Sequence, residues 1–348
     1  MRRAYPSPRL PPARGGEGLG WGIIGFGWVA RDYAAPGILA GGGRLVAVAD
    51  PDPRARCAAA AAGARAHEAA EALLADPGVQ AVYVATPNHL HRAVVEAAAA
   101  AGKPVLCEKP MAATLGDAEA MTAAVARAGV PYGTAFDQRH HPAHAAIRGA
   151  IADGAVGTVT AVRIAYACWL DADWAPDNWR ADPARAGGGA LIDLAPHGLD
   201  LVEFLLGEPL EAVAALTQTR VQGYAVDDGA MLVARTARGV LAQLHVAYNC
   251  PEALPRRRLE VLGTSGQILA ERTMGQTPGG DVWLIDGRLG LRRPLPVPDA
   301  GASPFARQMA AFARFVADGS GDFSAARDLH TMSLLARAYA AQECVPCR

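Results

Sequence analysis

The sequence has no long hydrophobic run and no excess of charge of either sign. No apolar stretch reaches the roughly 18 residues that a membrane-spanning helix needs. The formal net charge is −1 at pH 7, which argues against nucleic-acid partners and anionic membrane surfaces, because both usually require a basic patch. The positively charged start is followed by no apolar segment before Gly20, so the sequence predicts no secretion signal.

Cysteine is scarce and scattered. Four of the six cysteines lie in apolar or aromatic surroundings, where buried thiols are the usual outcome. Cys344 and Cys347 have the spacing of a redox or metal pair, but no second pair accompanies them, and a structural zinc site needs four ligands. His140, His141 and His144 also lack a carboxylate pair, and we interpret them as surface residues between domains. The sequence therefore predicts no metal site and a cytoplasmic location.

Two domains are expected, because 348 residues suffice for two sizeable cores. Residues 1–19, rich in proline, glycine and arginine, are expected to form a flexible extension. Over 20–137, short apolar strands alternate with alanine-rich helical stretches, which is typical of a doubly wound parallel sheet and predicts a Rossmann domain. The predicted strands are 22–24, 45–49, 81–85, 105–107 and 132–136, and the predicted helices are 54–75, 90–101 and 115–129.

The pattern changes after residue 137. Residues 138–348 contain runs of strands with period-two character, separated by turn residues, and few helices. This pattern predicts an α+β domain on a mostly antiparallel open sheet. The predicted strands are 159–167, 210–218, 230–236, 240–248, 257–262 and 281–285, and the predicted helices are 143–152, 193–206, 304–318 and 325–342.

A glycine-rich turn, Gly25–Ala30, follows the first predicted strand and precedes a helical pattern. In such a turn the first glycine makes the tight bend, the second lets a pyrophosphate approach the backbone, and a small third residue allows close helix–strand packing. Asp50, 23 residues beyond Gly27, ends the second strand, where a carboxylate accepts hydrogen bonds from the adenosine ribose and repels a 2′-phosphate. NAD is therefore the predicted cofactor, and Arg54 keeps NADP open as an alternative.

Glu108-Lys109-Pro110 follows the fourth short apolar strand. Ligands of open α/β sheets collect at the carboxyl ends of the strands, so Lys109 is placed where a nicotinamide ring and its substrate meet. A lysine after a strand is more often a solvated loop charge. The glycine turn upstream and the Asp193/His197 pair downstream favour the functional interpretation.

Four motifs together resemble the Gfo/Idh/MocA family, which contains glucose–fructose oxidoreductase, inositol dehydrogenases and many sugar dehydrogenases. They are Gly25–Ala30, Thr86–His91, Glu108–Pro110 and Gly187–Asp193, and a further match is Gly263–Gly266. The resemblance runs from about residue 20 to about residue 342. It implies an NAD(P)-dependent oxidoreductase acting on a sugar or polyol, assembled as a homodimer or homotetramer through the open sheet.

The resemblance and the glycine turn also imply roles for single residues. The predicted cofactor-binding residues are Gly25, Phe26, Gly27, Trp28, Val29, Asp50, Arg54, Thr86, Pro87, Asn88, His91, Glu108 and Lys109. Glu108 and Lys109 match residues next to the nicotinamide, and Asp193 and His197 match the acid and the imidazole facing the substrate, to which Lys109 is also expected to bind. Where family members commonly have glycine, this chain has Ala195 followed by Pro196. Because proline fits a first helical turn, the helix carrying His197 is expected to begin close to Asp193.

Oxidation of a secondary alcohol needs a base for the hydroxyl proton, and an imidazole suits that role at neutral pH. We assign His197 as the acid–base group and Lys109 as the ammonium that stabilises the alkoxide and relays the proton. Asp193, four residues before His197, shares its helix face and is expected to orient the imidazole or to bind a neighbouring hydroxyl. The competing interpretation is a capping aspartate and a structural histidine, neither of them catalytic.

Trp169, Trp174, Trp179 and Arg180 precede the triple glycine. Aromatic faces and a guanidinium suit polyhydroxylated rings, which makes Trp179 and Arg180 candidate substrate-binding residues, although packing between domains explains them equally well. The leading function is an NAD(P)-dependent sugar or cyclitol dehydrogenase. The alternatives are an enzyme that oxidises a sugar transiently to cleave a glycoside and a non-catalytic dinucleotide-binding regulator. Retention of Lys109, Asp193 and His197 together argues against the regulator.

Overall fold

The computed structural model describes residues 18–171, 173–174 and 178–341. Most of the predicted extension at 1–19 and the Cys344/Cys347 pair lie outside these residues. The chain divides into two compact units. The first comprises the described residues up to Ala135 together with Phe305–Leu329, and the second comprises Phe136–Pro304 and the residues from His330 onward. Among the described residues no helix is both long and apolar enough to cross a membrane.

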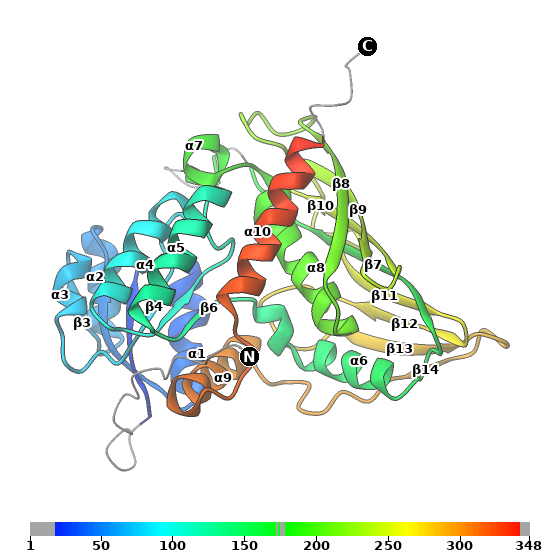
Figure 1. The fold of residues 1–348 in the computed structure, drawn as a ribbon, viewed down its shortest axis with the longest axis horizontal. Helices are drawn as coiled ribbons and strands as arrows, with labels where there is room; N and C mark the ends of the chain where they lie inside the picture. Colours follow the sequence, from blue (N-terminus) through cyan, green and yellow to red (C-terminus); the bar gives the residue numbers. More distant parts are fainter. Residues whose placement is uncertain (1–17, 172, 175–177, 342–348) are drawn as a thin grey trace. The chain divides into compact units, whose positions relative to one another are not determined.

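The first unit is built on a parallel sheet of six strands in the order β3-β2-β1-β4-β5-β6. Figure 1 labels β3, β4 and β6 of this sheet among the blue and cyan elements. The order reverses between β1 and β4, and in such sheets ligands bind at the point of reversal. This is the doubly wound fold that the sequence predicted. The strands are β1 (Gly20–Ile24), β2 (Arg44–Ala49), β3 (Arg65–His67), β4 (Ala81–Val84), β5 (Val105–Cys107) and β6 (Tyr132–Thr134). The helices are η1 (Ala30–Ala34), α1 (Ala35–Ala40), α2 (Pro53–Ala61), α3 (Ala70–Leu74), η2 (Asn88–Leu90), α4 (His91–Ala100), α5 (Leu115–Ala128) and α9 (Pro304–Asp318).

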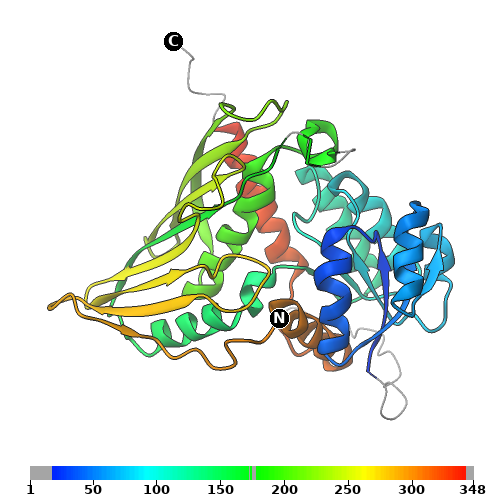
Figure 2. The same cartoon turned by 180° about the vertical axis from the view of Figure 1, so that it is seen from behind.

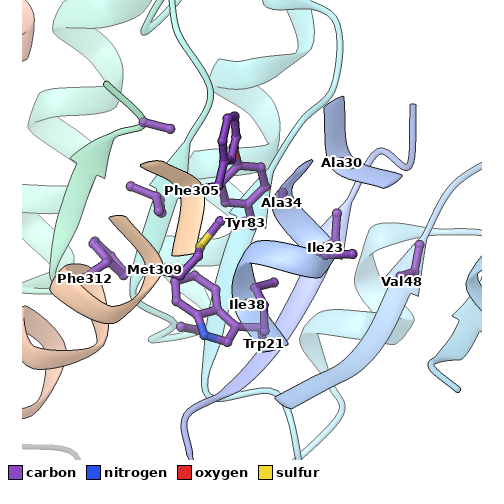
Figure 3. Close-up of a cluster of buried hydrophobic side chains, with 14 of the residues drawn as sticks. Trp21, Ile23, Ala30, Ala34, Ile38, Val48, Tyr83, Phe305, Met309 and Phe312 are labelled. Atoms are coloured by element: carbon purple, nitrogen blue, oxygen red, sulfur yellow. The ribbon is translucent and has the colours of Figure 1, made fainter. Parts of the chain in front are cut away.

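Helix α9 returns to this unit from late in the chain because it supplies part of the core. Phe305, Met309 and Phe312 lie in one buried cluster with side chains of β1, α1, β2 and β4 (Figure 3). The ring of Phe312 lies 5.7 Å from that of Trp21. The sequence pattern assigned residues 304–318 to the second domain, since an amphipathic helix shows which face is apolar but not which core receives it.

The alanine-rich stretch 54–75 is not the single helix that its composition predicted. Helix α2 ends before Gly63, which has a φ of 84°, a conformation that glycine adopts without strain. The three residues of β3 then pair with β2 at the sheet edge, and α3 follows. Alanine has high helix propensity, and a three-residue edge strand is too short to show a period of its own.

The second unit contains a sheet of eight strands in the order β14-β13-β12-β11-β7-β10-β9-β8. Only the β7–β10 pair is parallel, so the sheet is mixed and mostly antiparallel, as predicted. Strands β12 and β14 were not predicted. The strands are β7 (Val159–Ala167), β8 (Leu210–Gln218), β9 (Gly229–Thr236), β10 (Leu241–Ala247), β11 (Arg257–Gly263), β12 (Gly266–Glu271), β13 (Asp281–Asp286) and β14 (Arg292–Pro294). The helices are η3 (Asp137–His140), α6 (Pro142–Ala152), η4 (Trp179–Ala181), α7 (Pro183–Ala186), α8 (Ala190–Leu206) and α10 (Ala325–Ala340), whose first residues belong to the first unit.

Helix α8 lies along one face of this sheet, against β7, β9 and β10 (Figures 1 and 2). Residues alternate along β9, so that Leu232 is buried while Met231 and Val233 are at least half exposed. Leu216, directly opposite Met231 on β8, is also exposed. The face of the sheet away from α8 therefore carries large apolar side chains that are exposed.

Candidate active site

The glycine turn has the geometry that a dinucleotide-binding turn needs. Gly25 has a φ of 86°, and a Cβ there would lie 2.7 Å from the carbonyl oxygen of Ala85. Gly27 differs, because a Cβ at Gly27 would meet no atom of the protein within 4 Å. The protein's own packing thus requires glycine at the first position only. Open space at Gly27, next to a helix that begins at Trp28 and Val29, fits the approach of a pyrophosphate to the backbone.

Asp50 fastens this turn to the end of β2. Its Oδ2 accepts the N–H of Phe26 at 2.7 Å, and its Oδ1 accepts the N–H of Asp52 at 2.8 Å. Arg54 is held by Asp52, with its Nη2 3.0 Å from Asp52 Oδ2. The hydrogen bond from Arg54 lowers the pKa of the Asp52 carboxyl. The predicted ribose partner therefore also has a structural role, and the predicted alternative phosphate partner already has an acidic neighbour.

The loop after β4 is braced by a buried histidine. His91 Nε2 lies 2.9 Å from the carbonyl oxygen of Thr86, and Nδ1 lies 3.1 Å from that of Pro110. Burial lowers the pKa of His91 despite these carbonyls. His91 therefore ties the Thr86–Asn88 loop, including Pro87, to the segment after Lys109. The buried hydroxyl of Thr86 has no hydrogen-bond partner among the described residues, as expected of a group that meets a ligand.

Lys109 lies just beyond the carboxyl end of β5 and is partly buried. Its N–H donates to Glu108 Oε2 at 3.2 Å, and Tyr83 on β4 donates its hydroxyl to the same carboxylate. The Glu108 N–H bonds the carbonyl of Val84 at 2.9 Å, which anchors the segment to the end of β4. Because the strands are parallel, the glycine turn, the Thr86 loop and Lys109 share one edge of the sheet. The first unit thus assembles all the predicted cofactor-binding segments.

In the second unit, the triple glycine lets other side chains reach the start of α8. A Cβ at Gly188 would lie 2.2 Å from the Tyr339 hydroxyl, and one at Gly189 would lie 1.9 Å from the carbonyl oxygen of Asp227. Asp227 accepts the N–H groups of Gly189 at 2.9 Å and of Leu191 at 2.8 Å, and it accepts the Tyr339 hydroxyl at 2.9 Å. A carboxylate is favourable at a helix amino terminus. Asp227 therefore caps α8, although it is not itself part of that helix.

The helix carrying His197 begins at Ala190, earlier than expected. Pro196 therefore lies inside the helix instead of in its first turn. The expectation was wrong because it considered the cost of an interior proline, about 3 kcal/mol, in isolation. Nearly all of α8 is buried, and Asp227 anchors its start, so tertiary contacts outweigh the lost backbone hydrogen bond.

Asp193 and His197 face different partners. Asp193 Oδ2 accepts the hydroxyl of Tyr248 at 2.7 Å. The carboxylate beside His197 is that of Asp137, whose Oδ1 lies 3.2 Å from the imidazole Nδ1, and both side chains are 4% exposed. The Tyr166 ring packs edge-on against the imidazole, with centroids 5.3 Å apart. The expected pairing of Asp193 with the imidazole is thus replaced by two separate pairs.

The aromatic segment forms a stacked group. The Arg180 guanidinium lies 4.3 Å from the Trp179 ring centroid and 5.4 Å from that of Trp174. Trp169 donates its indole N–H to Asp171 at 2.6 Å. These side chains are half-buried or exposed.

Two of the three histidines, His141 and His144, are not at the surface, which corrects the expectation for them, whereas His140 is half-buried. His141 and His144 are fully buried in the second unit. His141 caps α6 by accepting the N–H of Ala143 at 3.2 Å, and His144 contacts the Thr273 hydroxyl at 3.2 Å. Burial lowers the pKa of His144 to about 3, so it is neutral at physiological pH. These are structural histidines that hold α6 to the connection between β12 and β13.

Comparisons with known proteins agree with these two units. The family model "Oxidoreductase family, NAD-binding Rossmann fold" matches residues 19–136. The model "GFO/IDH/MocA C-terminal domain" matches residues 144–269. Among curated proteins, 1,5-anhydro-D-fructose reductase of Ensifer adhaerens is 38% identical over 267 residues, which cover 76% of this chain and 79% of that protein.

Solved structures of oxidoreductases resemble this protein over nearly the whole chain. Aldose–aldose oxidoreductase from Caulobacter crescentus, in complex with glycerol, has a TM-score of 0.84 at 28% identity, covering 94% of this chain and 98% of that one. Levoglucosan dehydrogenase in complex with NADH and L-sorbose has a TM-score of 0.82 at 26% identity, covering 94% and 97%.

Proposed function

Because the chain belongs to the Gfo/Idh/MocA family of NAD-binding oxidoreductases, we propose that it transfers a hydride between a nicotinamide cofactor and a sugar, sugar derivative or cyclitol. The reacting group is a secondary hydroxyl or the corresponding ketone. The observation that carries the proposal is the shared strand edge of the first unit, where Gly27 leaves room for a pyrophosphate and Lys109 follows β5. The sugar class rests on what the relatives are named for.

The proposed roles follow from the chemistry of each side chain. The bound cofactor supplies the hydride acceptor or donor at its nicotinamide ring. In the oxidative direction, His197 Nε2 takes the hydroxyl proton and the Lys109 ammonium stabilises the negative charge on the substrate oxygen. Asp193, fixed by Tyr248, accepts a hydrogen bond from a neighbouring hydroxyl. Trp179 and Arg180 offer a flat face and donors to the rest of the ring.

The test is an assay for net cofactor turnover. Purified protein is offered a panel of polyols, aldoses, anhydrosugars and cyclitols with NAD⁺ or NADP⁺, and the matching ketoses and anhydroketoses with NADH or NADPH. We expect nicotinamide absorbance to change with at least one member. Cleavage of a glycoside without net absorbance change would favour the alternative of transient oxidation, and cofactor binding without either reaction would favour the regulator.

The same assay tests cofactor choice. We expect kcat/KM to be higher with NAD than with NADP, because a 2′-phosphate beside the Asp50 carboxylate is repelled in a partly desolvated site. Arg54 is the only cation that we predicted as a partner for the 2′-phosphate. It already contacts Asp52, so a 2′-phosphate has to compete with Asp52 for it. A higher kcat/KM with NADP would show that Arg54 leaves Asp52 and decides the preference.

The open face of the second sheet is proposed to contact a second copy of this chain in the cytoplasm. Leu216 and Val233 are 63% and 60% exposed, which leaves apolar surface that an oligomer would cover. We expect a homodimer or homotetramer in light scattering at micromolar concentration. Val233→Asp should shift the mass towards the 36.1 kDa monomer, whereas Leu39→Asp, at an exposed leucine of the first unit, should not. A monomeric parent protein would contradict the proposal.

A further inference from the structure

We propose that Asp137 is the positioning residue of His197. Its carboxylate holds the imidazole in the tautomer that carries the proton on Nδ1, so that Nε2 presents a lone pair to the substrate hydroxyl. The inference rests on the proposed function for the meaning of that lone pair, because only a reaction with proton transfer needs Nε2 as a base. The tautomer itself can be measured without any reaction.

The pair is buried and close. Asp137 begins η3, directly after the end of the first unit, and is 3% exposed, while His197 lies in α8 and is also 3% exposed. Asp137 Oδ1 lies 3.2 Å from His197 Nδ1, which is close enough for direct contact between the carboxylate and an N–H at that nitrogen. Burial removes the water that screens exposed charges, so a carboxylate at this distance strongly favours a proton on the nitrogen it faces.

The imidazole is available to a ligand at its other nitrogen. His197 Nε2 is buried and has no hydrogen-bond partner among the described residues. Nδ1 is near Asp137 but is not aligned with it as a hydrogen bond. Hydrogen bonds at catalytic residues are often long or misaligned in free enzymes and tighten in the substrate complex. A buried polar nitrogen without a partner is costly, and a substrate hydroxyl at Nε2 would satisfy it.

The other groups near the imidazole leave Asp137 as the anion that acts on it. Tyr166 of β7 packs on the ring, and burial together with the charge of Asp137 raises the pKa of Tyr166, so its phenol is neutral. The Arg257 guanidinium of β11 lies over the Tyr166 ring, 5.7 Å from the ring centroid. Asp193, on the same helix as His197, accepts the Tyr248 hydroxyl.

Neighbouring contacts fix which way an amide would point if it replaced the Asp137 carboxylate. Gln138 Nε2 donates to the carbonyl of Gly275 at 2.9 Å, which sets the orientation of the Gln138 amide. The same Nε2 donates to Asp137 Oδ2 at 2.9 Å. In Asp137→Asn the amide oxygen should therefore face Gln138 and the NH₂ group should face His197 Nδ1. That NH₂ group donates, so the imidazole proton moves to Nε2 and the base is lost.

The experiment reads the tautomer and the rate separately. Full-length protein with ¹⁵N-labelled histidine is studied by NMR, with and without NAD⁺, at a pH where imidazoles are neutral, and His197→Asn assigns the signal. We expect a protonated Nδ1 and a bare Nε2 at His197 in the parent protein, and the reverse in Asp137→Asn. In the same variant kcat should fall by about 10²–10⁴ with little change in cofactor Kd.

Glu203→Gln is the matched control, because Glu203 Oε1 lies 3.3 Å from His330 Nε2 in another histidine–carboxylate pair of this unit. It should leave the His197 signal unchanged. A parent protein with its proton on Nε2, or an Asp137→Asn variant with the parent's tautomer and rate, would overturn the inference and leave the proposed function untouched. An inactive parent protein with the expected tautomers would instead remove the proposed function and retain the positioning role. If Asp137→Asn does not fold, the tautomer of His197 in the parent protein still decides whether the inference holds.

Discussion

Lys109→Ala should lower kcat by about 10²–10⁴ or more while the protein stays folded and still binds cofactor. Lys109 is partly exposed at the end of β5, so its removal leaves no large cavity. The loss arises because the ammonium faces a charge that develops on the substrate oxygen only during the reaction. Lys109→Arg should restore little of the lost activity. A guanidinium is broader than an ammonium and does not relay a proton, so it replaces Lys109 in neither role.

The composition of the chain offers a matched control for this prediction. Lys103 and Lys109 are its two lysines. Lys103 Nζ donates to the carbonyl of Val79 at 2.6 Å, away from the strand ends that carry the glycine turn. Lys103→Gln should therefore leave kcat near the parent value. Near-normal turnover in Lys109→Ala, measured with the substrate that the assay identifies, would show that Lys109 is an ordinary loop charge.

His197→Ala should lower kcat by about 10²–10⁴, the range expected for a positioned acid–base group. The KM of the cofactor should change little, because the predicted cofactor contacts all belong to the first unit. The His197 side chain is buried, with 3% of the residue exposed, so the alanine variant should also unfold at a lower temperature.

His197→Asn separates the two effects. Asparagine fills more of the space of the imidazole but cannot accept a proton, so it should recover part of the thermal stability and none of the activity. Thermal unfolding and steady-state rates of both variants check this. An active His197→Asn variant would mean that proton transfer uses another group.

Much of the fold could be predicted from local patterns, and the exceptions have physical causes. Continuous apolar runs marked β1, β2, β4 and β5 because both faces of a parallel sheet are buried. The short edge strands β3 and β14 have three residues each, which is too few for a period. Strand β12 was not predicted; it begins at Gly266, the last residue of the Gly263–Gly266 motif. The sequence did not predict that α9 belongs to the first unit, because the pattern of an amphipathic helix does not show which core its apolar face packs against.

For the candidate site, the sequence located the side chains but not their partners. Lys109, Asp193 and His197 were found because their motifs are local. Asp137 and Tyr248 were missed, since each meets its partner across more than 50 residues of sequence. The one available signal for Asp137 was a carboxylate directly after the last predicted strand of the first domain. Asp227 and Tyr339 lie against the triple glycine and leave no room for side chains there. No local sequence pattern predicts these contacts.

We propose that Lys109 and His197 serve the same chemical step. This proposal is tested most directly by comparing kcat/KM for Lys109→Ala, His197→Ala and the double variant with one substrate. Residues that act as a unit are strongly non-additive, so the double variant should lose little more than the worse single variant. A loss equal to the product of the two single losses would show that the two residues act independently and would contradict the claim.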